Sequence, residues 1–331
     1  MARSLHSDAG AILSRLAQEG VNALYHFTSV ENLPGICQLQ ALCSRETLEG
    51  EGQRLTLVTG GNPLSHSLDR YRGNWDKVSL NLTPYTPMAY HRKKQQHLCF
   101  LVISPKVAAW SGVVFTDTNA TSNDHRRGEG VGGLDFIKFE IIRSTAHPDK
   151  HDWKRYVQAE VLVPDRIPFE YVSEIHFVSK ASMAHAEQLC SLFPHPRFMV
   201  NERLFSDSPR SSQGTIGFPY VIELILTDAK IDKNMVYFSY NHKNRFSKSS
   251  DLATLVAKVK AMAGTQARVL LHPTNIVGTL ADIIETTEFE KSEQYYHWHQ
   301  ISLKELSHGL YKVEYYLNEI CWASTDFEVI Q

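Results

Sequence analysis

The sequence predicts an α+β protein with few helices, and three observations support this class. Apolar residues at helical spacing are confined to short segments, such as the run between Asp8 and Gly20. Short aliphatic runs recur between these segments, and residues 98–104 (LCFLVIS) are the clearest buried strand. Long polar segments without a steady period separate the runs. Short helices, short strands and long loops are together typical of an α+β fold.

The elements of the N-terminal part follow in chain order. Helices are expected at residues 9–19, at 30–39 and from 182. Strands are expected at 24–27, 98–104, 113–115, 156–163 and 174–178. Two segments rich in polar residues and glycine, 49–77 and 119–133, are expected to be long loops.

A segment dense in Ser, Pro and Gly divides the chain. We therefore expect a first domain at residues 1–205, a linker at 206–217 and a C-terminal α+β domain or extension at 218–331. The expected strands of the last part are 220–226, 235–240, 269–272 and 310–316. A helix is also expected from Asp251 to Gly264, with one apolar stripe. The stripe comprises Leu252, Leu255, Val256, Val259 and Met262.

The composition is that of a globular protein with a sizeable core. Of 331 residues, 43% are hydrophobic, and 34 Lys and Arg stand against 36 Asp and Glu. This balance excludes a polycation that coats nucleic acid but allows a local basic groove. The five cysteines are scattered without a C-x-x-C pair, which favours buried thiols in a reducing cytosol. No apolar run is long enough to span a membrane, so a cytoplasmic protein is expected.

The stretch 156–164 (YVQAEVLVP) carries a carboxylate within an apolar strand. Because side chains alternate along a strand, Gln158 and Glu160 share one face. The other face holds Val157, Ala159, Val161 and Val163. An unpaired buried charge is expensive, so Glu160 points to a carboxylate mounted at the floor of a cleft. A half-exposed antiparallel strand with a polar outer face explains the pattern equally well.

Four segments in order resemble the signatures of the DarT family. Residues 24–36 (LYHFTSVENLPGI) resemble its opening signature. Residues 84–90 (PYTPMAY), 115–120 (FTDTNA) and 158–163 (QAEVLV) resemble its S-P-M-x-Y, F-x-D-x-N-A and Q-A-E-F-L-V elements. The resemblance covers roughly residues 20–180 and leaves the C-terminal part without a counterpart.

DarT proteins are bacterial toxins of toxin–antitoxin pairs that transfer ADP-ribose from NAD to bases of single-stranded DNA. The resemblance implies an ADP-ribosyltransferase fold, with a split antiparallel sheet around an NAD cleft. It implies mono-ADP-ribosylation of thymine, or of guanine, in a toxin–antitoxin or phage-defence system. NAD would be a consumed cosubstrate, and no metal is required. The implied partners are single-stranded DNA and a cognate antitoxin, by resemblance a macrodomain ADP-ribosylglycohydrolase.

The resemblance also assigns site residues. Glu160 would stabilise the positive charge that develops on the ribose, with Gln158 beside it. The remaining NAD contacts would come from His26, Thr28, Asn32, Tyr85, Met88 and Tyr90. The family's catalytic arginine lies between the first two signatures. Arg70 is favoured for this role here, followed by Arg72 and then Arg54.

Basic and aromatic residues flank the expected cleft, a combination that is typical of single-strand binding. The candidates for DNA contacts are Arg72, Trp75, Arg92, Lys93, Arg126 and Arg127. Taken alone, Arg92 and Lys93 are equally typical of a solvated turn.

Two other functions remain open at this point. An NAD glycohydrolase, or an ADP-ribosyltransferase acting on RNA or protein, would need the same NAD cleft. A non-catalytic nucleic-acid-binding module would keep the fold without turnover. The run His297-Trp298-His299 does not indicate a metal site, because no further ligand stands at suitable spacing.

Overall fold

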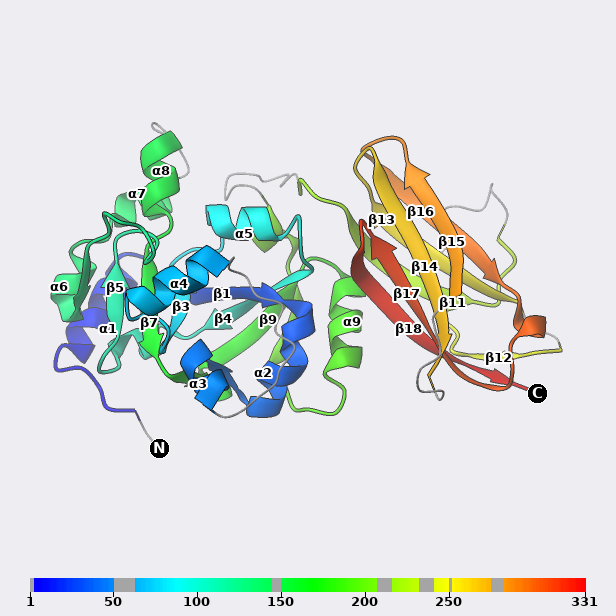
Figure 1. The fold of residues 1–331 in the computed structure, drawn as a ribbon, viewed down its shortest axis with the longest axis horizontal. Coiled ribbons are helices and arrows are strands. Elements are labelled where there is room, and N and C mark those ends of the chain that lie inside the picture. Colours follow the sequence, from blue (N-terminus) through cyan, green and yellow to red (C-terminus); the bar gives the residue numbers. More distant parts are fainter. Residues whose placement is uncertain are drawn as a thin grey trace. The chain divides into compact units, whose positions relative to one another are not determined.

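The structure, a computed structural model, describes residues 3–50, 63–144, 150–206, 216–231, 241–249, 252–274 and 282–331 (Figure 1). The chain forms two compact units. The first comprises Met1–Phe177 and Leu189–Thr215, and the second Val178–Gln188 and Ile216–Gln331. Helix α9 (Lys180–Leu189) thus belongs almost entirely to the second unit, although its residues lie inside the sequence range 1–205 expected for the first domain.

An eight-stranded sheet forms the centre of the first unit, in the order β10-β9-β4-β1-β3-β7-β5-β6. Its neighbouring strands pair antiparallel except for β9 and β10, which pair in parallel. The strand bounds are Leu24–Ser29 (β1), Lys77–Asn81 (β3), Leu98–Ile103 (β4), Val114–Thr116 (β5), Arg127–Glu129 (β6), Glu160–Pro164 (β7), Val172–Phe177 (β9) and Arg197–Val200 (β10). The predicted α+β class with antiparallel strands is confirmed.

The sheet is nearly divided in its middle. Strands β1 and β3 pair only at Tyr25 and Asn81, whereas β1 pairs with β4 along its whole length and β3 with β7 likewise. Two half-sheets therefore diverge from one point of backbone pairing. This divergence opens the space in which the candidate site lies.

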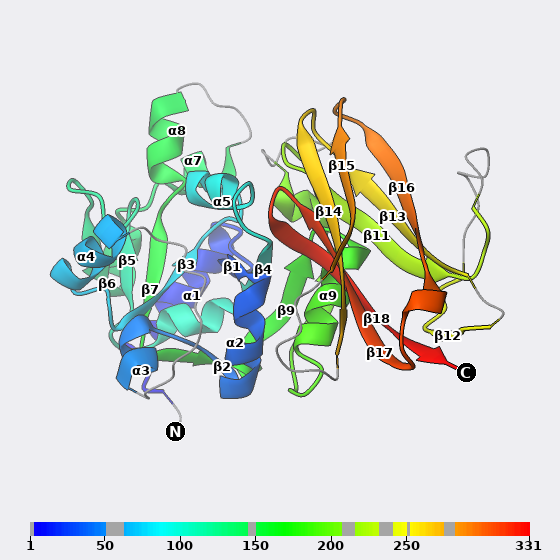
Figure 2. The ribbon, with the colours of Figure 1, turned by 45° about the vertical axis from the view of Figure 1, so that its right-hand side comes forward.

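Short helices and a small hairpin-like sheet surround the central sheet (Figure 2). The helices are α1 (Ala9–Gln18), α2 (Leu33–Leu39), α3 (Arg45–Gly50), α4 (Pro63–Tyr71), α5 (Pro87–Arg92), α6 (Gly130–Leu134), α7 (Phe139–Arg143) and α8 (Lys150–Tyr156). The small sheet pairs β2 (Ala41–Cys43) with β8 (Arg166–Pro168). Short 3-10 turns are η1 (Val30–Asn32), η2 (Pro105–Ala109), η3 (Phe169–Tyr171) and η4 (Glu202–Phe205). Within the described ranges, no helix is both long and apolar enough to cross a membrane.

Three expected boundaries are corrected by the structure. The loop expected at 49–77 contains α4, in which Leu64, Leu68 and Tyr71 stand at helical spacing within an otherwise polar sequence. The loop expected at 119–133 contains β6 and α6. The strand expected at 156–163 begins only at Glu160, because the chain before it ends helix α8 at Tyr156.

The second unit contains two sheets besides α9. One has the order β11-β13-β16 and the other β12-β18-β17-β14-β15. The strand bounds are Tyr220–Thr227 (β11), Arg245–Ser247 (β12), Ala253–Lys260 (β13), Thr265–Pro273 (β14), Asp282–Phe289 (β15), Gln294–Ile301 (β16), Gly309–Leu317 (β17) and Ile320–Ile330 (β18). A 3-10 turn, η5 (Leu303–Glu305), connects β16 to β17.

The helix expected from Asp251 to Gly264 is wrong, because its centre is strand β13. This strand is the central one of its sheet, and most of its residues are buried on both faces. A strand that is apolar on both faces also places apolar residues at helical spacing, which explains the misleading stripe. The strand expected at 235–240 and most of the linker expected at 206–217 lie outside the described residues.

Close packing of two glycines holds β6 against α6. A Cβ atom at Gly133 would meet the carbonyl oxygen of Gly128 and lie 2.6 Å from its carbonyl carbon. It would also lie 3.0 Å from the Phe115 ring. A Cβ atom at Gly132 would meet nothing within 4 Å.

We therefore predict opposite effects for these neighbouring positions. Gly133→Ala should lower the free energy of unfolding by about 1–3 kcal/mol, because backbone atoms must move. Gly132→Ala is the matched control and should leave stability unchanged or raise it by about 1 kcal/mol, because alanine favours the helix. Urea unfolding followed by circular dichroism measures both. Equal stability of the two variants would contradict the packing described.

Candidate active site

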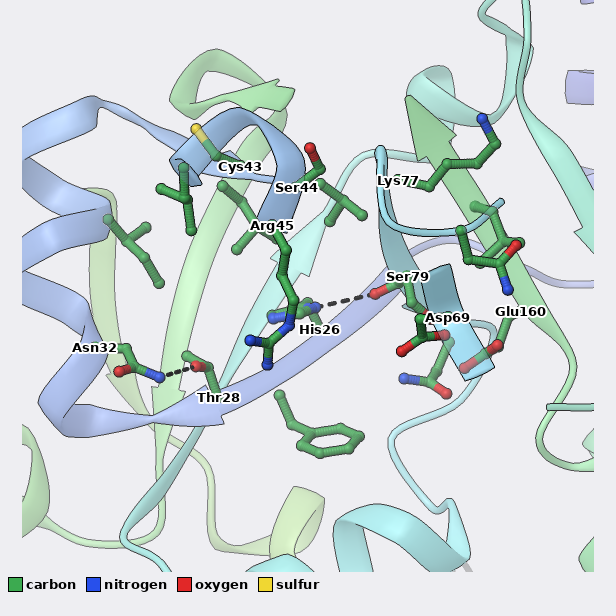
Figure 3. Close-up of a pocket in the computed structure, with 18 of the residues that line it drawn as sticks. His26, Thr28, Asn32, Cys43, Ser44, Arg45, Asp69, Lys77, Ser79 and Glu160 are labelled. Atoms are coloured by element: carbon green, nitrogen blue, oxygen red, sulfur yellow. Dashed lines mark hydrogen bonds between the residues drawn. The ribbon is translucent and has the colours of Figure 1, made fainter. Parts of the chain in front are cut away.

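A cavity of about 470 Å³ lies over the divergence of β1 and β3. It is lined by residues of β1, α2, α3, β3 and β7 and of the turn after β5 (Figure 3). This volume falls within the range of ordinary small-molecule sites. Five residues predicted to contact NAD line it: His26, Thr28, Asn32, Met88 and Gln158.

His26 spans the two half-sheets. Its Nδ1 lies 3.0 Å from the carbonyl oxygen of Ser79 on β3 (Figure 3). A carbonyl only accepts, so Nδ1 carries the proton and Nε2 keeps its lone pair. Burial lowers the pKa of His26, which outweighs the opposing effect of the Ser79 carbonyl. The ring is therefore neutral at neutral pH, with a fixed tautomer.

Thr28 and Asn32 form the other fixed pair on this side of the cavity. Asn32 donates from Nδ2 to Thr28 Oγ1 at 2.9 Å (Figure 3). The pair joins the end of β1 to the turn that precedes α2. The signature 24–36 thus supplies both a strand and the polar groups at its end.

Glu160, the first residue of β7, lies at the opposite side of the cavity. The backbone N–H of Ala120 donates to its Oε2 at 2.8 Å. Burial of the carboxylate raises its pKa from 4.5 to about 7, against the lowering effects of Ala120 and the Ser79 hydroxyl. Asp69 raises this pKa further. The residue as a whole is partly exposed, so its carboxylate faces a cavity that a ligand can enter.

The turn that holds Glu160 is itself fixed by side chains. Asn119 accepts from the backbone N–H of Thr121 at 2.9 Å, which closes the turn presenting Ala120. Gln158 lies on the cavity wall, and its amide donates to the carbonyl oxygen of Lys154 at 2.7 Å. The segments 115–120 and 158–163 therefore build one side of the site together.

Among the described residues, Arg45 lines the cavity and Arg70 does not. Arg70 is exposed, ion-pairs with Glu49 at 2.7 Å and lies over the Trp75 ring at 4.0 Å. Arg45 reaches from α3 into the cavity beside His26 (Figure 3). Among the described residues, no ion pair within 4.0 Å involves Arg45. Arg54 lies outside the described residues.

Sequence reasoning missed Arg45 and Asp69. Arg45 stands at the start of a short helix after a three-residue strand, and no resembling segment includes it. Asp69 lies in α4, within the range expected to be a loop. The sequence does not indicate that they lie near His26 and Glu160, because the four residues come from separate elements that line the same cavity.

Four predicted site residues lie elsewhere. The Tyr85 hydroxyl donates to the carbonyl oxygen of Arg203 at 3.2 Å. Tyr90 accepts from Lys94 at 2.8 Å. Lys93 is only 4% exposed, and its ammonium group donates to the carbonyl oxygen of Phe205. This burial contradicts the predicted DNA contact at Lys93. Arg92 donates to Gln95 Oε1 at 3.2 Å.

The other basic candidates gather near the Glu160 side. Arg127 donates to the carbonyl oxygen of Arg72 at 3.1 Å, and Arg72 donates to Asn123 Oδ1 at 2.7 Å. Arg126 is exposed next to them. Trp75 lines the cavity. Arg72, Arg126 and Arg127 form what we call the basic cluster.

One family model matches the chain. The family model described as ssDNA thymidine ADP-ribosyltransferase, DarT, matches residues 25–203, more than half of the 331 residues. No curated protein matches the chain.

Similar solved structures carry the same family name. Thermus sp. 2.9 DarT in complex with ADP-ribosylated ssDNA has a TM-score of 0.46 and 19% identity, over 56% of this chain and 96% of that chain. Its complex with NAD+ has a TM-score of 0.44 and 18% identity, over 56% and 97%. Thermosipho africanus DarTG in complex with ADP-ribose has a TM-score of 0.47 and 17% identity, over 62% and 53%.

The match to this family model defines the first unit as that of an ADP-ribosyltransferase, as the sequence predicted. The family match covers both His26 and Glu160. The chain belongs to the DarT family. Among the described residues, no group of three or more His, Cys, Asp or Glu side chains is arranged to hold a metal ion.

The raised pKa of Glu160 has a measurable consequence for stability. Between pH 4.5 and about 7 the folded protein binds a proton at Glu160 that the unfolded chain releases. The stability from this group is therefore complete below pH 4.5 and is lost as pH rises through about 7. Glu160→Gln cannot titrate at this position. Its free energy of unfolding minus that of the wild type should therefore be about 1–3 kcal/mol larger at pH 8 than at pH 5. Urea unfolding at both values tests this, and a pH-independent difference would contradict it.

Proposed function

We propose that this protein transfers one ADP-ribose from NAD+ to a base, preferably thymine, in single-stranded DNA. The observation that carries the proposal is the Glu160 carboxylate, held by the Ala120 N–H in a cavity within the family-matched region. The family description, ssDNA thymidine ADP-ribosyltransferase, supports both the acceptor and the base.

The NAD+ diphosphate would bind where Arg45 enters the cavity. This guanidinium is partly buried, and desolvation lowers its pKa. The charges of Asp69 and Glu49 raise this pKa, although neither forms an ion pair with Arg45 among the described residues. A partly desolvated cation of this kind favours an anionic ligand. Arginine is suited to this because its planar fork binds phosphate oxygens in pairs. His26, Thr28 and Asn32 line the same end of the cavity and would complete the NAD+ contacts.

Glu160 would act on the ribose. The bond between ribose C1′ and the nicotinamide nitrogen breaks, the electron pair leaves with nicotinamide, and positive charge develops on the sugar. A carboxylate fixed through one oxygen keeps the other oxygen for a ribose hydroxyl or for this charge. Gln158 lies beside it on the cavity wall. The base nitrogen then bonds to C1′ and loses its proton.

The DNA would lie across the basic cluster. Arg72, Arg126 and Arg127 flank the turn that presents Ala120 to Glu160. Phosphates of a single strand bind such arginines, while an unstacked base enters the cavity. Arg92 remains proposed as an outlying contact, because it is partly exposed.

The test is incubation of the purified protein with NAD+ and single-stranded oligonucleotides, read by mass spectrometry. We expect a product heavier by one ADP-ribose, formed with thymine-containing strands and absent with the Glu160→Ala variant. Fragmentation identifies the base, and an adduct on guanine would refute the thymine preference.

Other outcomes would support the competing functions. Nicotinamide release without any adduct indicates a glycohydrolase, and adducts confined to RNA or protein indicate another acceptor. Binding of DNA without NAD+ turnover indicates a non-catalytic module. Each of these results would overturn the proposal.

The family context extends the proposal to a biological role. A DNA-modifying enzyme of this kind would be toxic to the cell that makes it and would need an antitoxin. We propose a macrodomain protein that removes ADP-ribose, and the similar Thermosipho africanus protein carries the DarTG name. The adduct from the assay above is the substrate on which such a partner is tested.

The two arginines should differ in their effects. Arg45→Ala should raise the KM for NAD+ about tenfold or more, because a charge-assisted contact is lost in a desolvated site. Arg70→Ala should raise it less than threefold or so, because an exposed ion pair contributes little. Steady-state nicotinamide release measures both variants. A larger effect of Arg70→Ala would restore Arg70 as the principal cation.

A further inference from the structure

The cavity contains a second carboxylate, which the steps above leave without a role. Asp69, on α4, lines the cavity together with Glu160. Figure 3 shows the two carboxylates turned toward the same region beside Ser79. Glu160 reaches this region from β7, so two separate elements bring acidic groups together.

The surroundings of Asp69 favour a group that exchanges a proton. Burial raises its pKa, Arg45 lowers it through its charge, and a hydrogen bond from the Asn74 side chain lowers it further. Glu160 and Asp69 disfavour each other's ionised form. Asn74 also donates to the carbonyl oxygen of Ala120 at 3.5 Å. The Asn74 side chain therefore links Asp69 to Ala120, whose N–H binds Glu160.

Asp69 lies on the side where the acceptor would enter. The helix that carries it ends at Tyr71, whose ring is 87% exposed, and Arg72 of the basic cluster follows directly. His26 and Thr28, proposed for NAD+, lie across the cavity from it (Figure 3). Asp69 therefore stands between the proposed DNA surface and the reacting ribose.

The reaction requires a proton acceptor at this place. NAD+ and a base N–H give ADP-ribosylated base, nicotinamide and one proton. Glu160 is engaged with Ala120 and is proposed to face the ribose. Building on the proposed function, we propose that Asp69 is a second catalytic carboxylate, the general base for the acceptor. The base nitrogen gives its proton to Asp69, its electron pair forms the bond to C1′, and the bond to nicotinamide breaks with its pair on the nicotinamide nitrogen. Asp69 then releases the proton to solvent.

A purely structural role predicts a different result. As a counter-ion of Arg45, Asp69 would only orient the guanidinium that holds NAD+. Its loss would then weaken NAD+ binding and slow nicotinamide release and DNA modification together. A general base acts only on the step that involves the DNA base. Its loss should therefore slow adduct formation and leave nicotinamide release without DNA nearly unchanged.

The experiment compares the wild type with Asp69→Asn and Asp69→Glu at saturating NAD+ and oligonucleotide, between pH 6 and 9. DNA adduct is measured in this mixture and nicotinamide release in a parallel reaction without oligonucleotide, and Asp135→Asn, an exposed change in the same unit, is the control. With Asp69→Asn we expect adduct formation to fall about 100-fold or more, and nicotinamide release in the absence of DNA to stay within about threefold of the wild type. The residual adduct rate should rise with pH as the free base deprotonates, and Asp69→Glu should restore part of the rate.

The opposite results overturn the inference. Equal losses of both products, with a raised KM for NAD+ and no rescue by Asp69→Glu, would make Asp69 a positioning residue. An unchanged adduct rate in Asp69→Asn would exclude any role in the acceptor step. Absence of the adduct in the wild type would refute the proposed function itself, and thermal unfolding of each variant separates loss of function from loss of fold.

Discussion

The hydrogen bond between His26 Nδ1 and the Ser79 carbonyl oxygen joins the two halves of the first sheet where their backbone pairing ends. Strands that diverge leave backbone groups without partners, and a buried unpaired carbonyl costs about 1–3 kcal/mol. The imidazole satisfies this carbonyl while keeping the half-sheets apart. A direct backbone pairing would close the space that the cavity occupies. The same position of the His26 ring therefore supports the sheet and lines the cavity.

The same opening determines the chemistry of Glu160. Two hydrogen-bond donors, the Ala120 N–H and the Ser79 hydroxyl, lower its pKa, yet burial raises it to about 7. Desolvation is thus the larger effect, and a shift of this size corresponds to about 3 kcal/mol disfavouring the anion in the folded state. A residue kept only for stability would be better replaced by an uncharged one. Strong perturbation in a cavity is the pattern that functional carboxylates show.

The sequence was informative where function and local structure share a segment. The signature 24–36 contains both β1 and the polar groups at its end, so His26, Thr28 and Asn32 followed from it directly. Glu160 and Gln158 followed from the resemblance, whereas the expected strand alternation does not reach Gln158, because β7 begins at Glu160. Arg45 did not, because a short helix after β2 brings it to the cavity from outside every signature.

The predicted DNA contact at Lys93 and the predicted helix at residues 251–264 were wrong for a related reason. The Lys93 ammonium is buried by the distant carbonyls of Phe205 and Ser206, and nothing near it in the chain indicates them. Strand β13 is apolar and largely buried on both faces, and periodicity alone does not distinguish such a strand from a helix. In both cases, contacts with residues distant in the sequence determine the structure, and the local sequence pattern does not reveal them.

The acceptor side of the cavity is built as one coupled assembly rather than as independent loops. Arg127 on β6 donates to the backbone of Arg72, and Arg72 donates to Asn123 in the turn before β6. Asn74 then ties the end of α4 to Ala120, which holds Glu160. Groups proposed to bind phosphate and groups proposed to do chemistry thus share the same backbone supports. A strand bound at the basic cluster would therefore lie on the segments that also support Ala120 and Glu160.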